Sequence, residues 1–220
     1  MPIFVPDLSM LPPPQVRLWQ ELGSTPESFT LYGGTALALR LGHRSSVDFD
    51  FFSNEPFDPE RLASAVPYLR DAERVQVAPN TLTCRVDRGG PVLLSFFGGL
   101  GLGQVAERDQ AQGPAVRVAS LLDIAGTKMA VVQPEVKDYL DVNALLEHGI
   151  DLPTALAAGS VVYGRNFNPL ITLKALSFFD DLESLPLEVR DRLRAAVAVV
   201  EVTKLPVLRA FSARGDQQKP

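Results

Sequence analysis

Hydrophobic and polar residues follow different periods in the two halves of the chain. Between Phe29 and Phe97, short stretches alternate with a period of two, which is typical of strands, and turn residues separate them. Beyond Val118 the apolar residues recur at helical spacing, and prolines and glycines mark the ends of the helices. The pattern predicts an α/β (α+β) chain with two domains: residues 1–118 form a small mixed sheet with flanking helices, and residues 119–220 are mostly helical.

Local signals place about five strands and a larger number of helices. The strands are predicted at residues 29–32, 47–52, 74–78, 82–86 and 92–97. The helices are predicted at residues 15–22, 35–41, 59–69, 121–132, 135–147, 153–162, 169–178 and 187–204. Three polar residues that can accept a backbone hydrogen bond are expected to cap helices, namely Thr35, Asp58 and Ser120.

Composition and charge narrow the class of protein. The 220 residues are 46% hydrophobic and 21% charged, which is ordinary for a folded protein with a substantial core. A net charge of −5 argues against broad non-specific binding to nucleic acid but leaves room for a local basic patch. One cysteine excludes an internal disulfide, and two distant histidines do not favour a zinc site. The chain lacks a run of about 18 apolar residues and the pattern of a signal peptide, so we expect a cytoplasmic protein without a membrane span.

The segment Val-Asp-Phe-Asp-Phe at residues 47–51 carries the most informative polar pattern. Side chains at alternate strand positions share a face, so Asp48 and Asp50 point one way while the apolar residues point the other. Two adjacent carboxylates repel each other, and a divalent cation is the simplest compensation. Carboxylate oxygens suit Mg²⁺ or Mn²⁺. We therefore predict that Asp48 and Asp50 are metal ligands; the alternative is an acidic strand face exposed to solvent.

Two glycines precede this strand at the start of a predicted helix. Gly33, Gly34 and Thr35 would place backbone N–H groups at a helix N-terminus, where donors and the helix dipole favour a phosphate. Without β-carbons at positions 33 and 34, an anion can approach the backbone closely. A Gly-Gly pair alone is most often only a turn, but strand, Gly-Gly, helix and acidic strand is a specific order. It predicts a phosphate-binding turn next to the acidic pair.

Further charged residues suggest contacts with a triphosphate. Lys128 lies in an otherwise apolar predicted helix and could place a cation on the phosphates; the alternative is a lysine that extends into solvent. Asp138 and Asp141 are three apart on the next predicted helix, so they share a side, where they could orient Lys128 or act as a base toward an acceptor hydroxyl. Lys137 and Arg44 are additional candidate phosphate contacts, and each is equally suited to a surface ion pair.

These motifs together resemble a known family. The Gly-Gly turn followed by an Asp-x-Asp strand resembles the nucleotidyltransferase superfamily of the polymerase-beta type. More narrowly, residues 31–39 and 43–52 are similar to the AbiEii/AbiGii toxin family of nucleotidyltransferases. Residues 123–130 resemble that family's helix with an essential lysine, and residues 136–141 resemble its Lys-Asp-x-x-Asp motif. The resemblance implies a nucleotidyltransferase-type sheet followed by a helical half that completes the active site.

The resemblance also implies an activity, a cofactor and partners. It implies Mg²⁺-dependent (or Mn²⁺-dependent) transfer of NMP from an NTP to an acceptor hydroxyl, by a toxin that is paired with an antitoxin and for which tRNA is one acceptor. The residues carried over as catalytic are Asp48, Asp50, Lys128, Asp138 and Asp141, with Asp48 and Asp50 on the metal. Those carried over as NTP contacts are Gly33, Gly34, Thr35, Arg44 and Lys137.

One departure from the wider superfamily leaves rival functions open. Its members commonly supply a third metal carboxylate from a later strand, and the corresponding strand here offers Ser95. Transfer to a small molecule such as an aminoglycoside-like antibiotic is therefore one alternative, and a binding module of the same fold without turnover is another. An exposed basic groove beside Asp48 would favour tRNA as the acceptor. A closed acidic pocket would favour a small amine, and the absence of metal binding would favour the inactive module.

Overall fold

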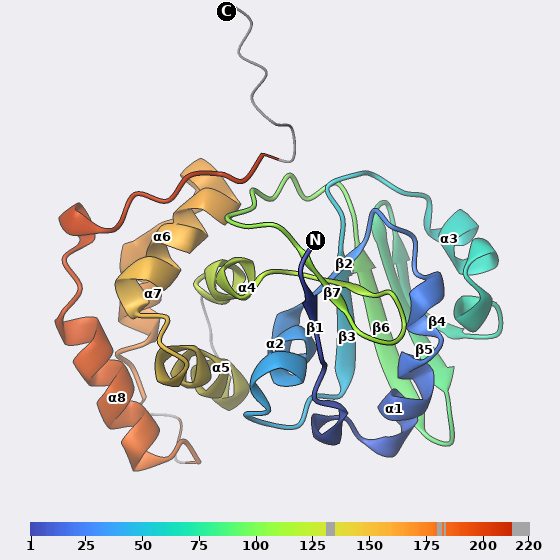
Figure 1. Ribbon diagram of the computed structural model, residues 1–220, viewed down its shortest axis with the longest axis horizontal. Coiled ribbons are helices and arrows are strands. Elements are labelled where there is room, and N and C mark those ends of the chain that lie inside the picture. The colour runs from blue at the N-terminus through green and yellow to red at the C-terminus, as the bar shows by residue number, and fades with distance from the viewer. Residues whose placement is uncertain (131–134, 180–181, 183, 213–220) are drawn as a thin grey trace, which may run out of the picture. The chain divides into compact units, whose positions relative to one another are not determined.

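The computed structural model describes residues 1–130, 135–179, 182 and 184–212 (Figure 1). The chain forms two compact units. The sheet unit comprises Met1–Gly101 and Arg108–Ala119, and the helical unit comprises Leu102–Glu107 and Ser120–Pro220. The expected α/β fold class is confirmed, with a mixed sheet in the first half and mostly helices in the second. A division into two domains at residue 118 stays a prediction.

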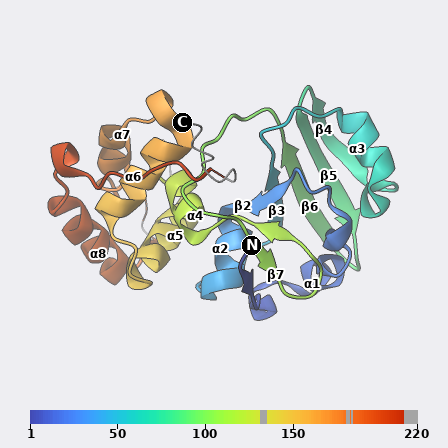
Figure 2. The ribbon, with the colours of Figure 1, turned by 45° about the horizontal axis from the view of Figure 1, so that its top comes forward.

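One mixed sheet forms the centre of the sheet unit. Its strands, within the described residues, are β1 (Ile3–Phe4), β2 (Thr30–Tyr32), β3 (Asp48–Phe52), β4 (Glu73–Ala78), β5 (Thr81–Asp87), β6 (Pro91–Phe97), β7 (Asp109–Ala111) and β8 (Arg117–Val118). Their order is β1-β7-β8-β2-β3-β6-β5-β4, and Figure 2 shows β2, β3, β6, β5 and β4 side by side. Strand β3 is antiparallel to β2 and parallel to β6, so the acidic segment lies inside the sheet and not at its edge.

The sequence prediction of about five strands is wrong, because β1, β7 and β8 were not expected. Each has only two or three residues, which is too short to show a period of two. They exist through pairing with distant segments: Ile3 pairs with Gln110, and Leu31 pairs with Val118. Such pairing depends on the tertiary fold and leaves no local signal.

The apolar side of β3 fixes the orientation of its polar side. Phe49 and Phe51 are fully buried, and their rings stack at 6.3 Å on Trp19 and at 5.1 Å on Phe96, respectively. Burying each side chain contributes roughly 1.5–3 kcal/mol. A slip of one residue would turn both rings to the other face, so their burial also fixes the direction of the carboxylates.

Helices and short 3₁₀ turns complete the sheet unit. Helix α2 (Gly33–Leu41) begins directly after β2, and Tyr32 is its N-cap, so the prediction that Thr35 caps it is wrong. Asp58 caps α3 as expected, and its carboxylate accepts a hydrogen bond from the Arg61 N–H at 2.8 Å. Helix α3 ends earlier than predicted because Val66, the residue before Pro67, is extended. The bounds are α1 (Pro13–Trp19), α2 (Gly33–Leu41), α3 (Pro59–Ala65), η1 (Leu8–Met10), η2 (Leu22–Ser24) and η3 (Pro67–Leu69).

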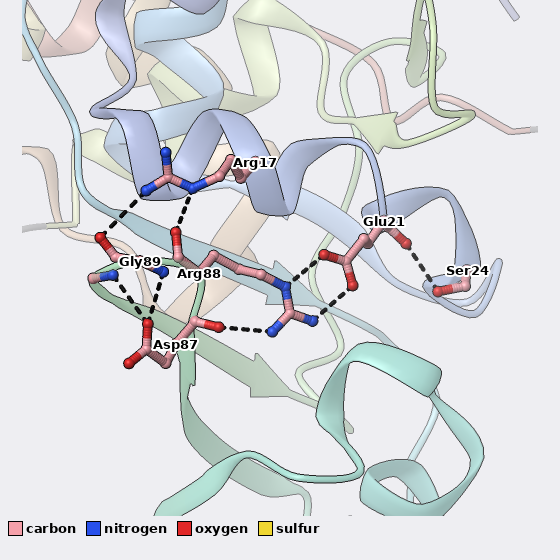
Figure 3. A network of polar contacts seen from close by, with 7 residues as sticks. Arg17, Glu21, Ser24, Asp87, Arg88 and Gly89 are labelled. Carbon is pink, nitrogen blue, oxygen red and sulfur yellow. Dashed lines mark hydrogen bonds and ion pairs between the residues drawn. The ribbon is translucent and has the colours of Figure 1, made fainter.

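A polar network joins the α1 region to the turn between β5 and β6 (Figure 3). Arg88 donates two hydrogen bonds to the Glu21 carboxylate, from Nε to Oε1 at 2.5 Å and from Nη2 to Oε2 at 2.7 Å. Arg17 of α1 donates to the carbonyl oxygens of Arg88 and Gly89. The hydrogen bond from Arg88 lowers the pKa of Glu21 below its ordinary value. The network therefore attaches α1 to the hairpin whose second strand, β6, neighbours β3.

We expect Glu21→Gln to lower the free energy of unfolding at pH 7 by about 1 kcal/mol or less, because solvent screens a pair that is about one third exposed. A lowered folded-state pKa means that the stabilisation is complete above the ordinary pKa and is lost as the pH falls through the folded value. The difference in Tm from wild type should therefore narrow below about pH 4.3.

The matched control is Glu73→Gln. Glu73 pairs with Arg85 at 2.6 Å, but the side chains are 62% and 46% exposed, so we expect no measurable change in Tm. A difference for Glu21→Gln that widens at acidic pH would contradict this account of the pair.

The helical unit contains α4 (Leu121–Lys128), α5 (Val136–Glu147), α6 (Leu152–Tyr163), α7 (Pro169–Ala175) and α8 (Leu187–Ala198), with η4 (Gly164–Asn166) and η5 (Val202–Lys204). Ser120 caps α4 as predicted. The prediction that this helix continues to residue 132 falls partly on residues 131–134, which lie outside the described residues. Helix α8 ends before the predicted residue 204. No helix in the described part of the chain is both long and apolar enough to cross a membrane.

A buried carboxylate attaches the segment Leu102–Glu107 to the helical unit. Asp123 of α4 is fully buried, and its Oδ1 accepts a hydrogen bond from the Val105 N–H at 2.6 Å. Its Oδ2 accepts from the Ser120 hydroxyl at 2.6 Å. In addition, the Gly103 N–H donates to the Val162 carbonyl at 2.9 Å. These contacts explain why a segment from the first half of the sequence belongs to the second compact unit.

Candidate active site

Strand β3 presents two carboxylates on one face of the sheet. Asp48 and Asp50 are partly exposed, whereas the alternate residues Phe49 and Phe51 are fully buried. This is the alternation that the sequence predicts for a strand with one apolar and one acidic face. The two carboxylates therefore lie on the same side, two residues apart on a rigid element.

A row of polar residues crosses the sheet beside Asp50. Asp50 is in register with Tyr32 of β2 and with Ser95 of β6, and Ser95 is in register with Thr83 of β5. Residues in register share a face, and the hydroxyls of Ser95 and Thr83 lie 3.4 Å apart. Ser95 thus places a hydroxyl next to Asp50, at the position where a third metal carboxylate would be expected.

The two glycines lie against charged groups of the site. A β-carbon on Gly33 would be 2.7 Å from Oδ2 of Asp50, and a φ of +74° at Gly33 also favours glycine. A β-carbon on Gly34 would overlap the guanidinium of Arg44. The first turn of α2 therefore has a carboxylate next to one glycine and a guanidinium next to the other. Its backbone N–H groups have no partner within the helix, which suits a phosphate group.

The side chain of Thr35 contacts the segment that leads into the acidic pair. Thr35 is 2% exposed, and its hydroxyl contacts the carbonyl oxygen of Asp48 and lies 2.7 Å from the Ser46 hydroxyl. The side chain is thus engaged inside the sheet unit. A contact from Thr35 to a phosphate would have to come from its backbone N–H in the first turn of α2.

The donor set on β3 fits a hard divalent cation. Asp48 and Asp50 offer carboxylate oxygens on one face, and Oδ2 of Asp50 lies where a β-carbon on residue 33 would crowd it. Among the residues that the structure describes, no cluster of three or more His, Cys, Asp or Glu side chains could hold a metal ion. Mg²⁺ commonly uses one or two carboxylates and completes its shell with water and phosphate oxygens, so the pair is compatible with it.

In the helical unit, one lysine binds two carboxylates. The Lys128 ammonium lies 2.6 Å from Oδ2 of Asp141 and 3.2 Å from Oδ1 of Asp138. The three side chains are 12%, 0% and 15% exposed, respectively, so Lys128 does not extend freely into solvent. Asp138 also accepts the Glu135 N–H and closes a capping box at the start of α5. The structure therefore brings together the three residues that the sequence placed on two helices.

The remaining predicted residues do not all join one cluster. Lys137 is exposed on α5 and lies 3.1 Å from Glu135, which corresponds to the surface ion pair that the sequence left as an alternative. Asp48 and Asp50 belong to the sheet unit, whereas Lys128 belongs to the helical unit. That these groups line one cleft stays a prediction.

Several residues that shape the site carried no clear sequence signal. Gln15 of α1 donates a hydrogen bond to the carbonyl of Val47 at 2.8 Å, immediately before the acidic pair. Ser46 contacts Thr35, and both are buried. A lone glutamine in a short helix and one of two adjacent serines look like ordinary surface residues in the sequence. Their contacts become visible only when the helices pack against β3.

The fold has a counterpart among solved structures. It is similar to the crystal structure of a "putative nucleotidyltransferase" from H. pylori, with a TM-score of 0.53. The match covers 84% of this chain and 90% of that chain at 20% sequence identity. The similarity concerns the fold alone, and it defines a nucleotidyltransferase-like fold.

Sequence comparison identifies the family. Residues 17–213 match the family model described as "Nucleotidyl transferase AbiEii toxin, Type IV TA system". The chain is also 32% identical over 159 residues to "Uncharacterized protein aq_aa25" of Aquifex aeolicus (strain VF5), which covers 70% of this chain and 74% of that protein. The chain belongs to the AbiEii family of nucleotidyl transferase toxins of type IV toxin–antitoxin systems, and the resemblance seen in its motifs is confirmed.

Proposed function

We propose that this toxin transfers NMP from an NTP to the 3′ hydroxyl of tRNA in a reaction that depends on Mg²⁺. The observation that carries the proposal is the pair Asp48 and Asp50 on one face of β3, next to the Gly33 and Gly34 turn of α2. Carboxylates that hold a cation beside a helix N-terminus form a site for a triphosphate, because both favour phosphate oxygens. Family membership supports the same reaction class.

The residues of the sheet unit would bind and orient the triphosphate. Asp48 and Asp50 would hold Mg²⁺, which when bound reduces the charge on the phosphates and favours the ionised form of the acceptor hydroxyl. The N–H groups of Gly33 and Gly34 would donate to phosphate oxygens. The guanidinium of Arg44, close to Gly34, would add a cationic donor to them.

The residues of the helical unit would supply a second cation. Lys128 is oriented by Asp141, which is fully buried, so we propose an orienting role for Asp141 and not a role as base. Asp138 is slightly exposed and is the better candidate to accept a proton from the acceptor hydroxyl. Lys128 would stabilise the charge that develops on the leaving pyrophosphate.

The choice of acceptor rests on the family. A toxin has to act on a component that the cell needs, and a tRNA 3′ hydroxyl is such an acceptor for NMP. The three arginines of α8 have partners within the protein: Arg190 donates to the carbonyls of Leu182 and Leu185, Arg192 binds Asn143, and Arg194 pairs with Asp191. They therefore do not indicate broad nucleic-acid binding. A cognate antitoxin follows from the type IV system.

Label transfer tests the acceptor. The protein is incubated with each α-³²P-labelled NTP, Mg²⁺ and total tRNA, with periodate-oxidised tRNA or an aminoglycoside mixture in parallel reactions. We expect label on intact tRNA with at least one NTP, and no label on oxidised tRNA. Label on the aminoglycosides alone would support the small-molecule alternative. Label on neither acceptor, together with no binding of Mn²⁺, would support the inactive module.

Gly34→Ala should weaken NTP binding and leave the fold intact. The new β-carbon would overlap the end of the flexible Arg44 side chain, which can move, and Gly34 has no positive φ. Displacing the guanidinium should raise the KM for the NTP by roughly 10-fold, as expected for loss of one charged hydrogen-bond donor. Gly23→Ala is the matched control, because its β-carbon would meet only ordinary contacts at 3.5 Å. An unchanged KM for Gly34→Ala would argue against the placement of the triphosphate.

A further inference from the structure

Side chains from two helices hold the residues that lead into the acidic pair. Gln15 of α1 is 4% exposed, and its Nε2 donates to the Val47 carbonyl at 2.8 Å. Thr35 of α2 is 2% exposed and donates to the Asp48 carbonyl. The backbone N–H of Ser46 donates to the carbonyl of Met10 at 3.3 Å. Hydrogen bonds from outside the sheet thus fix three consecutive residues, Ser46, Val47 and Asp48.

The position of Asp48 at the end of the sheet explains why such bonds are needed. Strand β2 pairs with β3 only as far as Tyr32, opposite Asp50, because the chain turns into α2 at Gly33. Asp48 is in register with Leu93 of β6 and has no register partner in β2. Backbone carbonyls away from water need a hydrogen-bond donor. The Thr35 hydroxyl, in the first turn of α2, is the donor to the Asp48 carbonyl. Helix α2 follows β2 at the point where the pairing of β2 with β3 ends.

The hydroxyls of Thr35 and Ser46 form a chain of contacts that ends at the Asp48 carbonyl. A threonine hydroxyl carries one hydrogen, and a carbonyl can only accept, so the hydrogen of Thr35 points at Asp48. The Thr35 hydroxyl also lies 2.7 Å from the Ser46 hydroxyl. Ser46 Oγ also lies beside Gly34, because a β-carbon there would be 3.4 Å away. The chain connects the proposed phosphate turn with the backbone of Asp48.

We propose that Thr35 is a positioning residue for the cation: its hydroxyl fixes the backbone of Asp48, so that the carboxylates of Asp48 and Asp50 keep one geometry. The proposal rests on the proposed function, in which this pair binds Mg²⁺. This role of the Thr35 side chain is separate from the predicted contact between the backbone N–H groups of this turn and a phosphate. Groups that orient metal ligands commonly change metal affinity by about 10-fold or more when they are removed.

The test uses Mn²⁺ alone, with the full chain. Thr35→Val keeps the branched shape and removes the hydroxyl, while Thr35→Ser keeps the hydroxyl. Free Mn²⁺ is titrated by electron paramagnetic resonance, and Tm is measured on the same samples. We expect Thr35→Val to raise the Kd for Mn²⁺ by about 10-fold and Thr35→Ser to stay within about 2-fold of wild type.

Thr25→Val is the matched control within the sheet unit. The Thr25 hydroxyl lies 2.7 Å from the Tyr68 hydroxyl, so the variant also loses a hydrogen bond but does not touch β3. It should bind Mn²⁺ like wild type even if its Tm falls as far as that of Thr35→Val. If Thr25→Val and Thr35→Val weaken Mn²⁺ binding equally, the proposal is overturned, because the effect would then reflect a general loss of stability.

Asp48→Asn separates failure of this proposal from failure of the proposed function. If Asp48→Asn loses Mn²⁺ binding and Thr35→Val binds like wild type, the positioning role of Thr35 is overturned while the metal pair stands. If wild type and Asp48→Asn have the same affinity for Mn²⁺, the acidic pair does not bind the cation, and the role of Thr35 is refuted as well.

Discussion

Asp48→Asn and Asp50→Asn should each lower the rate of nucleotidyl transfer by about 10³-fold or more, because each removes one of the two charges that would hold the cation. Both side chains are partly exposed, while the adjacent phenylalanines that anchor β3 remain in place. Removing one charge from a repelling pair should not destabilise the protein. Initial rates of transfer and Tm values of the same preparations check both parts of this expectation.

A matched variant separates the loss of the site from a general change in charge. Asp71→Asn removes an exposed carboxylate of the same unit, far along the chain from β3, and should transfer NMP at the wild-type rate. Wild-type rates in Asp48→Asn or Asp50→Asn would refute the metal assignment. Loss of activity together with a large fall in Tm would show that the acidic pair has a structural role instead.

Lys128→Met should lower turnover by roughly 10²-fold, because a charge-stabilising donor to the triphosphate is lost. The variant should also destabilise the helical unit by about 3 kcal/mol, since it leaves the carboxylate of Asp141, which is 0% exposed, without its ammonium. Activity and stability therefore change together in the single variant. Transfer rates and chemical denaturation are both required to interpret it.

The double variant Lys128→Met with Asp141→Asn resolves the two effects. Removing both charges also removes the buried negative charge that has lost its ammonium, so most of the lost stability should return. Turnover should stay low, because the cation is still absent. Recovery of activity along with stability would show that Lys128 serves only to neutralise Asp141, and its proposed role on the triphosphate would be abandoned.

The fold was predictable from the sequence where signals are local. The alternation at β3 predicted one buried and one acidic face, and Asp58 and Ser120 predicted two helix starts. The three short strands could not be predicted, because they depend on pairing with distant segments. The start of α2 was misplaced because threonine is a preferred N-cap residue, whereas the chain enters the helix directly from β2.

The candidate site was predictable in its charged residues and not in the groups that hold them. The spacing of Asp138 and Asp141 correctly indicated that both could contact Lys128. By contrast, Thr35 was assigned to a phosphate because of its place after two glycines. That its buried hydroxyl contacts the Asp48 carbonyl was not indicated by the sequence. Gln15 contributes a similar contact from a helix more than thirty residues earlier, and such contacts need a three-dimensional structure to be found.

The central claim is that the acidic pair supports transfer of a nucleotidyl group, and the position of a radioactive phosphate tests it most directly. Wild-type protein is incubated with total tRNA, Mg²⁺ and an NTP labelled at either the α or the γ phosphate. The account predicts that α label becomes attached to tRNA, that γ label is released in pyrophosphate, and that Asp48→Asn or EDTA prevents both. Attachment of γ label to the acceptor, or equal α labelling by wild type and Asp48→Asn, would contradict it.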